Sequence, residues 1–131
     1  MEIQDLNKLV EAWIAGVLLG RDERGQPTKE YETNWWALET VMNWKHDHQP
    51  ELLWNFILAV HERDVNGTVS GHLAAGPVED LLSEFGENYI ERVETLAASD
   101  VRFKRMLCGV WQDTMSDELW NRIQLARHGG C

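Results

Sequence analysis

The chain has 131 residues, of which 44% are apolar and 26% charged, as is typical of one globular domain (residues 1–131) that needs no disulfide and no metal to bury its core. Twelve Lys and Arg against 22 Asp and Glu give a formal charge of −10, which argues against direct nucleic-acid binding and against docking on anionic membranes. The charge fits a basic protein partner, or a surface that only keeps the protein soluble.

Two cysteines are present, Cys108 inside an apolar run and Cys131, and they do not form the pattern of a disulfide framework. No charged segment followed by an apolar one opens the chain, and no apolar stretch approaches the roughly 20 residues that span a bilayer. We therefore expect a cytoplasmic protein with reduced thiols.

The first half of the chain predicts three helices, because apolar residues recur at spacings of three and four. The first helix should end at Gly20, followed by a charged loop over residues 20–28. The second should end near His46, and Pro50 suits the first turn of the third. The expected buried stripes are Leu6, Leu9, Val10, Trp13, Ile14, Val17 and Leu18, then Tyr31, Trp35, Leu38 and Met42, widened by Trp36 and Trp44.

The stretch "DVNGTVSG" (residues 64–71) breaks this pattern and predicts a turn or, less favoured, a hairpin. Beyond it, "HLAAGPVEDLLSEFG" raises the choice between a ligand site and a helix start. A phosphate loop needs free N–H donors in a positive setting, whereas Pro77 removes a donor and two acids follow it. We therefore expect Pro77 to begin a helix, after Gly76 in a backbone conformation that disfavours a Cβ.

In that helix Glu79 and Asp80 should complement the positive end of the helix dipole, and Gly86 should be its left-handed stop. The remaining pattern predicts a helix around Tyr89–Ala97, another capped by Ser99 or Asp100, and a last one from Ser116, stapled by Met115 and Trp120. The residues expected to face inward between the last two caps are Phe103, Met106, Leu107, Val110 and Trp111.

The predicted fold is all-α, with about seven helices packed as antiparallel pairs in an irregular bundle or a short stack of helical hairpins. Seven Trp residues favour a heavily aromatic core, and an aromatic face for a partner is the alternative. The positions predicted to be structural are Gly76, Pro77, Gly109, Trp111 and Trp120.

No complete chemical motif is present, so we predict no catalytic residue, no metal ligand and no cofactor. His46 and His48 flank Asp47 at a spacing unsuited to one face of a helix, and a solvated helix end is the favoured reading. "HERD" (61–64) lacks the second histidine of a helical zinc motif. Cys108 lies between Leu107 and Gly109 and is expected to be a buried, inert thiol rather than a nucleophile.

Charge segregation is more informative than any motif, because residues 77–100 contain seven acids and only one base, Arg92. The predicted partner-binding residues in this segment are Glu79, Asp80, Glu84, Glu87, Glu91 and Glu94. Such an acidic face would speed and select association with a basic protein. The alternative is a bare solvated surface.

The segments "LAAGPVEDLLSEFG", "YIERVETLAASD", "LCGVWQ" and "LWNRIQLAR" follow one another between residues 71 and 127. Together they resemble a family of uncharacterised bacterial all-helical domains, one of the domains of unknown function. The Trp-rich "NWWALETVMNW" matches more loosely. The resemblance implies a small helical domain of bacteria and their mobile elements, and no catalytic residue. Agreement is best at Gly76, Pro77, Glu79, Asp80, Gly109, Trp111 and Trp120.

These observations predict a non-enzymatic protein-binding domain, an inhibitor or immunity-type protein that acts on a basic partner in bacterial or phage conflict. The immunity role is an analogy of size and charge. One alternative is an acidic nucleic-acid mimic that blocks a nucleic-acid-binding protein such as a defence nuclease, and a second is an enzyme with an unrecognised site. A homodimer is left open.

Overall fold

The computed structural model describes residues 2–63 and 66–131. The chain forms two compact units, Met1–His72 (unit 1) and Leu73–Cys131 (unit 2). Within the described residues the secondary structure is helical throughout, apart from an isolated antiparallel bridge between Arg21 and Pro27. This confirms the predicted all-α fold, while the single domain over residues 1–131 stays a prediction.

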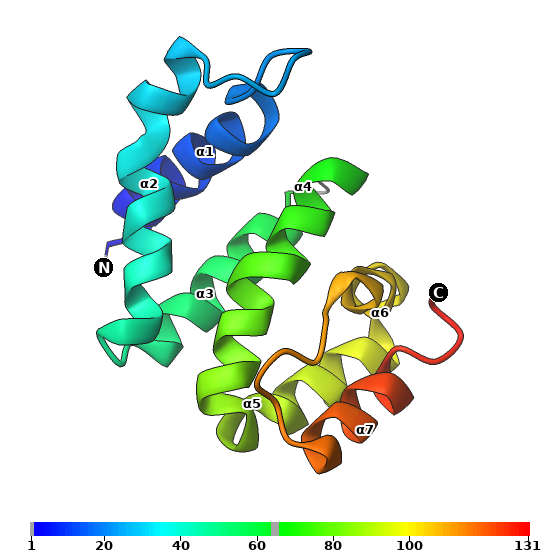
Figure 1. Cartoon of the computed structure of the whole chain (residues 1–131). Coiled ribbons are helices and arrows are strands. Elements are labelled where there is room, and N and C mark those ends of the chain that lie inside the picture. The colour runs from blue at the N-terminus through cyan, green and yellow to red at the C-terminus, as the bar shows by residue number, and fades with distance from the viewer. Residues whose placement is uncertain (1, 64–65) are drawn as a thin grey trace. The chain divides into compact units, whose positions relative to one another are not determined.

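Unit 1 is built on α1 (Ile3–Leu19), α2 (Lys29–His46) and α3 (Pro50–His61), with α1 and α2 side by side in Figure 1. The expected boundaries are confirmed. Gly20 follows the last residue of α1, Thr28 caps α2 by accepting a hydrogen bond from the Tyr31 N–H, and Pro50 occupies the first turn of α3.

The core of unit 1 centres on Phe56, which is fully buried and meets Trp13 and Trp44 edge to face, at ring distances of 5.4 and 5.9 Å. These tryptophans confirm an aromatic core. The predicted stripe on α2 was partly wrong, because the helix buries Ala37, Val41 and Trp44. Trp35, Trp36 and Met42 are instead among the exposed large side chains.

The segment after α3 is not a turn or hairpin where the structure describes it, because Gly67–Leu73 form α4. Asn66 starts this helix by accepting a hydrogen bond from the Val69 N–H at 3.0 Å. Asp64 and Val65, which also belong to the predicted turn, lie outside the described residues.

Unit 2 contains a π-helix η1 (Ala74–Val78), α5 (Glu79–Ser99), α6 (Val101–Met106), a 3₁₀ turn η2 (Leu107–Gly109) and α7 (Asp117–Ala126). The long α5 packs against α6 and α7 (Figure 1), and η1 packs against η2. Gly109 permits this last approach, because a Cβ there would lie 3.0 Å from the Ala74 Cβ. Ser116 caps α7 as predicted, by accepting from the Leu119 N–H.

The interpretation of the Gly76–Pro77 pair was wrong. Pro77 lies inside η1 rather than at a helix start, and Gly76 has no left-handed backbone and nothing within 4 Å of a Cβ placed on it. The wider π-turn, in which the Glu79 N–H donates to the Ala74 carbonyl, tolerates a proline that an α-helix interior would not. No exposed helix N-terminus therefore exists at Glu79 for an acid to complement.

Gly86 is also not the predicted helix stop. The backbone of Phe85 is non-helical (φ −130°, ψ 20°), so α5 bends there and then continues to Ser99. Gly86 is buried against Leu119 of α7, whose Cδ2 occupies the place where a Cβ of residue 86 would stand. The glycine is required by a close helix contact and not by a left-handed conformation.

The end of the chain differs most from the prediction. Cys108 and Cys131 form a disulfide with a Cα–Cα distance of 5.6 Å, so the expectation of reduced thiols was wrong. Trp111 was wrongly placed in the core, because the chain leaves η2 in an extended conformation at Val110 and carries Trp111 outward. Within residues 2–63 and 66–131, no helix combines the length and apolar character needed to cross a membrane.

Candidate partner-binding surface

The backbone on both sides of Trp111 is held at several points. Glu79 on α5 accepts the Trp111 N–H at 2.7 Å, and the Val110 N–H donates to the Leu107 carbonyl at 3.1 Å. From the C-cap of α7, the Arg127 Nη1 donates to the carbonyls of Val110 and Leu107 at 3.0 and 3.3 Å. The loop that carries Trp111 is therefore fixed to both neighbouring helices.

A covalent link fixes the same loop from a third direction. The disulfide joins Cys108, in η2 just before Val110, to Cys131 beyond the end of α7. Arg127, on the stretch between α7 and Cys131, also lies over the Trp120 ring, with its guanidinium carbon 4.8 Å from the ring centroid. Trp120 thus contacts the arginine that holds the loop, and its structural role stays a prediction.

The side chain that this fixed loop presents is exposed. Trp111 keeps 74% of its surface accessible, against 5–7% for the buried Trp13, Trp44 and Trp54. A large aromatic side chain on an ordered backbone loses little conformational entropy on binding, and exposed tryptophans are enriched among the residues that dominate binding energies. Trp111 is therefore the strongest candidate for a binding anchor in unit 2.

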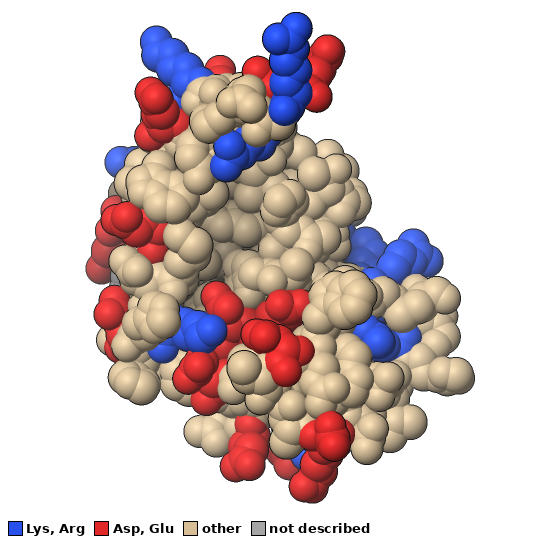
Figure 2. All heavy atoms as spheres, viewed as in Figure 1, with Lys and Arg blue, Asp and Glu red and all other residues tan. Residues whose placement is uncertain are grey.

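Carboxylates surround the base of this loop. Burial raises the pKa of Glu79, the hydrogen bond from the Trp111 N–H lowers it in part, and the charges of Asp113 and Asp80 raise it further. Asp113 follows Trp111 in the loop, and Asp80 follows Glu79 on α5. Figure 2 shows acidic side chains gathered where Figure 1 draws α5 and the orange loop that crosses it. A cation placed here would relieve this mutual repulsion.

We expect Glu79→Gln to keep the fold and to change its pH dependence. The Gln side-chain oxygen can still accept a hydrogen bond from the Trp111 N–H. The free energy of unfolding at pH 7 should therefore stay within about 0.5 kcal/mol of the wild-type value. Because the folded-state pKa of Glu79 is raised, its contribution to stability is largest below the ordinary glutamate pKa and is lost as pH rises through the raised value. The stability of the Gln variant relative to wild type should therefore increase as pH rises from the ordinary glutamate pKa through the raised pKa of Glu79.

Urea unfolding followed between pH 4 and 8 measures this difference. Glu91→Gln, on an exposed part of the same helix, controls for the change in net charge. A difference between Glu79→Gln and wild type that does not vary with pH, beyond that of the control, would contradict the prediction.

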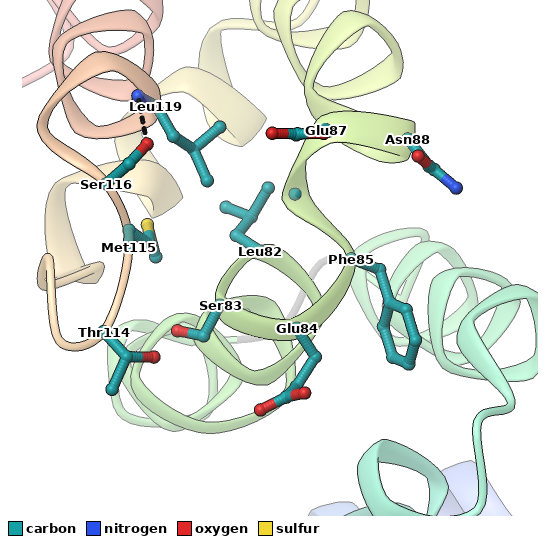
Figure 3. A pocket seen from close by; sticks show the side chains of 11 residues that line it. Leu82, Ser83, Glu84, Phe85, Glu87, Asn88, Thr114, Met115, Ser116 and Leu119 are labelled. Atoms are coloured by element: carbon teal, nitrogen blue, oxygen red, sulfur yellow. Dashed lines mark hydrogen bonds between the residues drawn. The ribbon is translucent and has the colours of Figure 1, made fainter.

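A pocket of about 290 Å³ adjoins the same loop at the bend of α5. Its walls come from α5 around Phe85 and Gly86 and from residues 114–119 (Figure 3). In Figure 3 the Ser83 hydroxyl points toward Thr114 and the Glu87 side chain toward Leu119, whereas Phe85 and Asn88 point away from that segment. The buried Ser83 hydroxyl oxygen has no hydrogen-bond partner among the described residues.

The lining of this pocket is acidic and amphipathic. Glu84 and Glu87 contribute carboxylates, none of the described residues that line the pocket is Lys or Arg, and Leu82, Met115 and Leu119 supply apolar surface. A basic side chain with an apolar stem fits this combination, because its stem can lie on apolar surface while its charge meets carboxylates. The bend of α5 at Phe85 lies in the wall of this pocket, opposite residues 114–119.

The six predicted acids therefore do not form one row. Glu79 holds the Trp111 loop, with Asp80 beside it, and Glu84 and Glu87 line the pocket. Glu91 is exposed, whereas Glu94 forms a bidentate ion pair with Arg122 of α7, with an Nε–Oε2 distance of 3.0 Å. This pair raises the pKa of Arg122. The structure places the predicted acids on unit 2 but gives them different roles.

The remaining candidates for metal binding and nucleophilic chemistry are His46, Asp47, His48 and Cys108. His46 ends α2 and Asp47 and His48 are exposed after it, and no group of three or more potential metal ligands occurs within the described parts of the chain. Cys108 is disulfide-bonded, so the expectation of an inert free thiol is corrected, and a thiol nucleophile is not available while the disulfide is formed.

Three residues of this surface were missed or misjudged by sequence reasoning: Trp111, Asp113 and Arg127. Val110, just before Trp111, is buried, so the pattern continued the inward stripe by one residue too many. The usable signal was "WQDT", where polar residues follow the tryptophan at once. Arg127 carried no signal, because its role depends on two carbonyls that lie 17 and 20 residues before it.

Comparison with known proteins adds the following. Residues 24–131 match a family of unknown function (DUF6869), so the match reaches well beyond the segment 71–127 and includes most of the Trp-rich helices of unit 1. No curated protein and no solved structure matches the chain.

Proposed function

The chain belongs to the family of unknown function DUF6869, and we propose that it is a non-enzymatic domain that binds a basic protein partner through unit 2. We name the residues that carry this proposal the Trp111 surface: Glu79, Asp80, Glu84, Glu87, Glu91, Trp111 and Asp113. In a bacterial or phage setting, such a domain would act as an inhibitor or immunity-type protein.

The observation that supports the proposal best is the fixed, exposed Trp111 beside carboxylates. An exposed tryptophan supplies the apolar contact that interface anchors need, and the acids around it supply the charge that selects and steers a basic partner. Of the 131 residues, only 12 are Lys or Arg, so long-range repulsion of the partner is small.

A protein-binding role is preferred to nucleic-acid mimicry for a geometric reason. Mimicry needs carboxylates that follow one another evenly along a face, as phosphates do along a strand. The bend at Phe85 and the pairing of Glu94 with Arg122 interrupt the acidic row of α5. An isolated apolar anchor such as Trp111 also has no counterpart in a phosphate backbone.

The test is capture of the partner from the native host, followed by measurement with the purified pair. The variant Glu84→Lys/Glu87→Lys/Glu91→Lys reverses three exposed acids of the Trp111 surface and leaves Glu79 and Glu94 in place. We expect its affinity for the partner to fall at least tenfold at low salt, and wild-type affinity to fall as salt is raised.

The matched control is Glu2→Lys/Glu23→Lys/Glu62→Lys, which makes the same change in net charge at exposed positions of unit 1. It should lose much less affinity. Equal losses of affinity in the two variants would mean that only the net charge of the protein matters for binding. That result would contradict the proposed surface. Turnover of an ester, phosphoester or nucleotide substrate, abolished by one point substitution, would contradict the non-enzymatic role.

A further inference from the structure

We propose that Trp111 receives an arginine side chain of the partner, which stacks on the exposed indole and pairs with the carboxylates at its base. This inference rests on the proposed function and adds to it the identity of the recognised side chain. It also assigns Trp111 a binding role in place of the core role expected from the sequence.

The indole offers the surface that a guanidinium needs. It is 74% exposed, and its backbone is fixed by Glu79, by Arg127 and by the disulfide at Cys108. A flat cation gains from lying over an aromatic face, and tryptophan is the best ring for this contact. A ring carried by a backbone that is held in advance loses less entropy when the cation arrives.

The carboxylates select a cation for this ring over an apolar side chain. Asp113 is two residues from Trp111, and it repels the Glu79 carboxylate that accepts the Trp111 N–H. Asp80 adds to this repulsion. An incoming positive charge reduces the repulsion, whereas an apolar group would bury the carboxylates without compensation.

Arginine fits better than lysine because of its shape. The planar guanidinium can lie on the ring and still direct its edge N–H groups to carboxylates, which a compact ammonium cannot do at once. The described residues already contain this kind of contact, with Arg21 over Tyr31, Arg92 over Tyr89 and Arg127 over Trp120, at 4.5 to 4.8 Å. Trp111 presents an exposed ring of the same kind to a partner.

Hexa-arginine and hexa-lysine peptides, which have the same charge, test the inference in low salt with the full chain. We expect hexa-arginine to bind about two- to fivefold more tightly and to shift the Trp111 indole N–H resonance, assigned by its loss in Trp111→Leu. Trp111→Leu should remove the preference for arginine, and Trp111→Phe should keep part of it. Trp36→Leu, at an exposed tryptophan of unit 1, should leave the preference unchanged.

The outcomes separate this inference from the proposed function. Equal binding of the two peptides, with no dependence on Trp111, would overturn the arginine site and leave a basic partner held by charge alone. Failure of both peptides to bind in low salt would overturn both proposals. A preference for arginine that survives in Trp111→Leu would place the arginine elsewhere and overturn the role of Trp111.

Discussion

Replacing Cys131 by Ser is expected to lower the free energy of unfolding of unit 2 by about 3 kcal/mol. The disulfide joins Cys131 to Cys108, 23 positions earlier in the sequence. A cross-link that closes a loop of this length lowers the conformational entropy of the unfolded chain, which stabilises the folded state by about 3 kcal/mol. Because domains of this size are stable by only about 5 to 15 kcal/mol, the loss is a large share of the total.

Guanidinium unfolding, followed with and without a reducing agent, measures this loss. Cys108→Ser and the double variant Cys108→Ser/Cys131→Ser should match Cys131→Ser, since each removes the same cross-link. A reducing agent should lower the stability of wild type and leave all three variants unchanged. Two reactive thiols per wild-type chain in denaturant without reductant would show that the cross-link does not form.

The same loss should affect the Trp111 surface. Cys108 lies in η2, two residues before the extended residue Val110, so its release removes one of the attachments of the Trp111 loop. The hydrogen bonds from Arg127 and to Glu79 remain, and they should keep the loop near its position. We therefore expect the cross-link to matter more for stability than for the identity of the recognised side chain.

The helices of this chain were predictable because the signals that set them are local. The pattern of α1, the position of Pro50 in α3 and the capping serine of α7 each lie within a few residues of the boundary they determine. In α1, the predicted residues Leu9, Val10 and Trp13 are buried. These features need no knowledge of which helices pack together.

The misread features all depend on contacts between distant segments. Pro77 is tolerated in a π-turn that packs against η2, about 30 residues later, and Gly86 is required by Leu119 of α7. In isolation, a Gly–Pro pair and a glycine after a phenylalanine indicate a helix start and a helix stop. Tertiary packing overrides both signals here. The disulfide was missed for the same reason, because its two cysteines are 23 residues apart in sequence and only the fold brings them together.

The acidic character of the candidate site could be predicted from the sequence, but the positions of its side chains could not. The excess of acids in residues 77–100 follows from composition, and the structure places most of them at the surface of unit 2. Their separation into a loop support, a pocket and an ion pair follows from the bend at Phe85 and from α7. Trp111 was assigned to the core because one buried residue before it continued the helical stripe.

Arg127→Ala is expected to lower the free energy of unfolding by about 2 to 4 kcal/mol. The guanidinium donates to the carbonyls of Leu107 and Val110 at 3.3 and 3.0 Å, and one good hydrogen bond from a charged donor contributes about 1.5 to 3 kcal/mol, with the longer of the two bonds contributing less. The variant also loses the stacking on Trp120. The two carbonyls would keep no donor from α7, so the turn that leads to Trp111 would loosen.

Two further variants make this measurement specific. Arg127→Lys keeps the positive charge but not the planar fork, so it should recover only part of the stability. Arg122→Ala removes the arginine within α7, whose partner Glu94 is partly exposed, and should cost no more than about 1 kcal/mol. Urea unfolding measures the stability of all three variants.

Hydrogen exchange of the Trp111 amide should speed up in Arg127→Ala and not in Arg122→Ala, because only Arg127 holds the turn. Equal costs for the two alanine variants, with the Trp111 amide equally protected in both, would mean that Arg127 contributes only surface charge and that the loop is held by Glu79 and the disulfide alone.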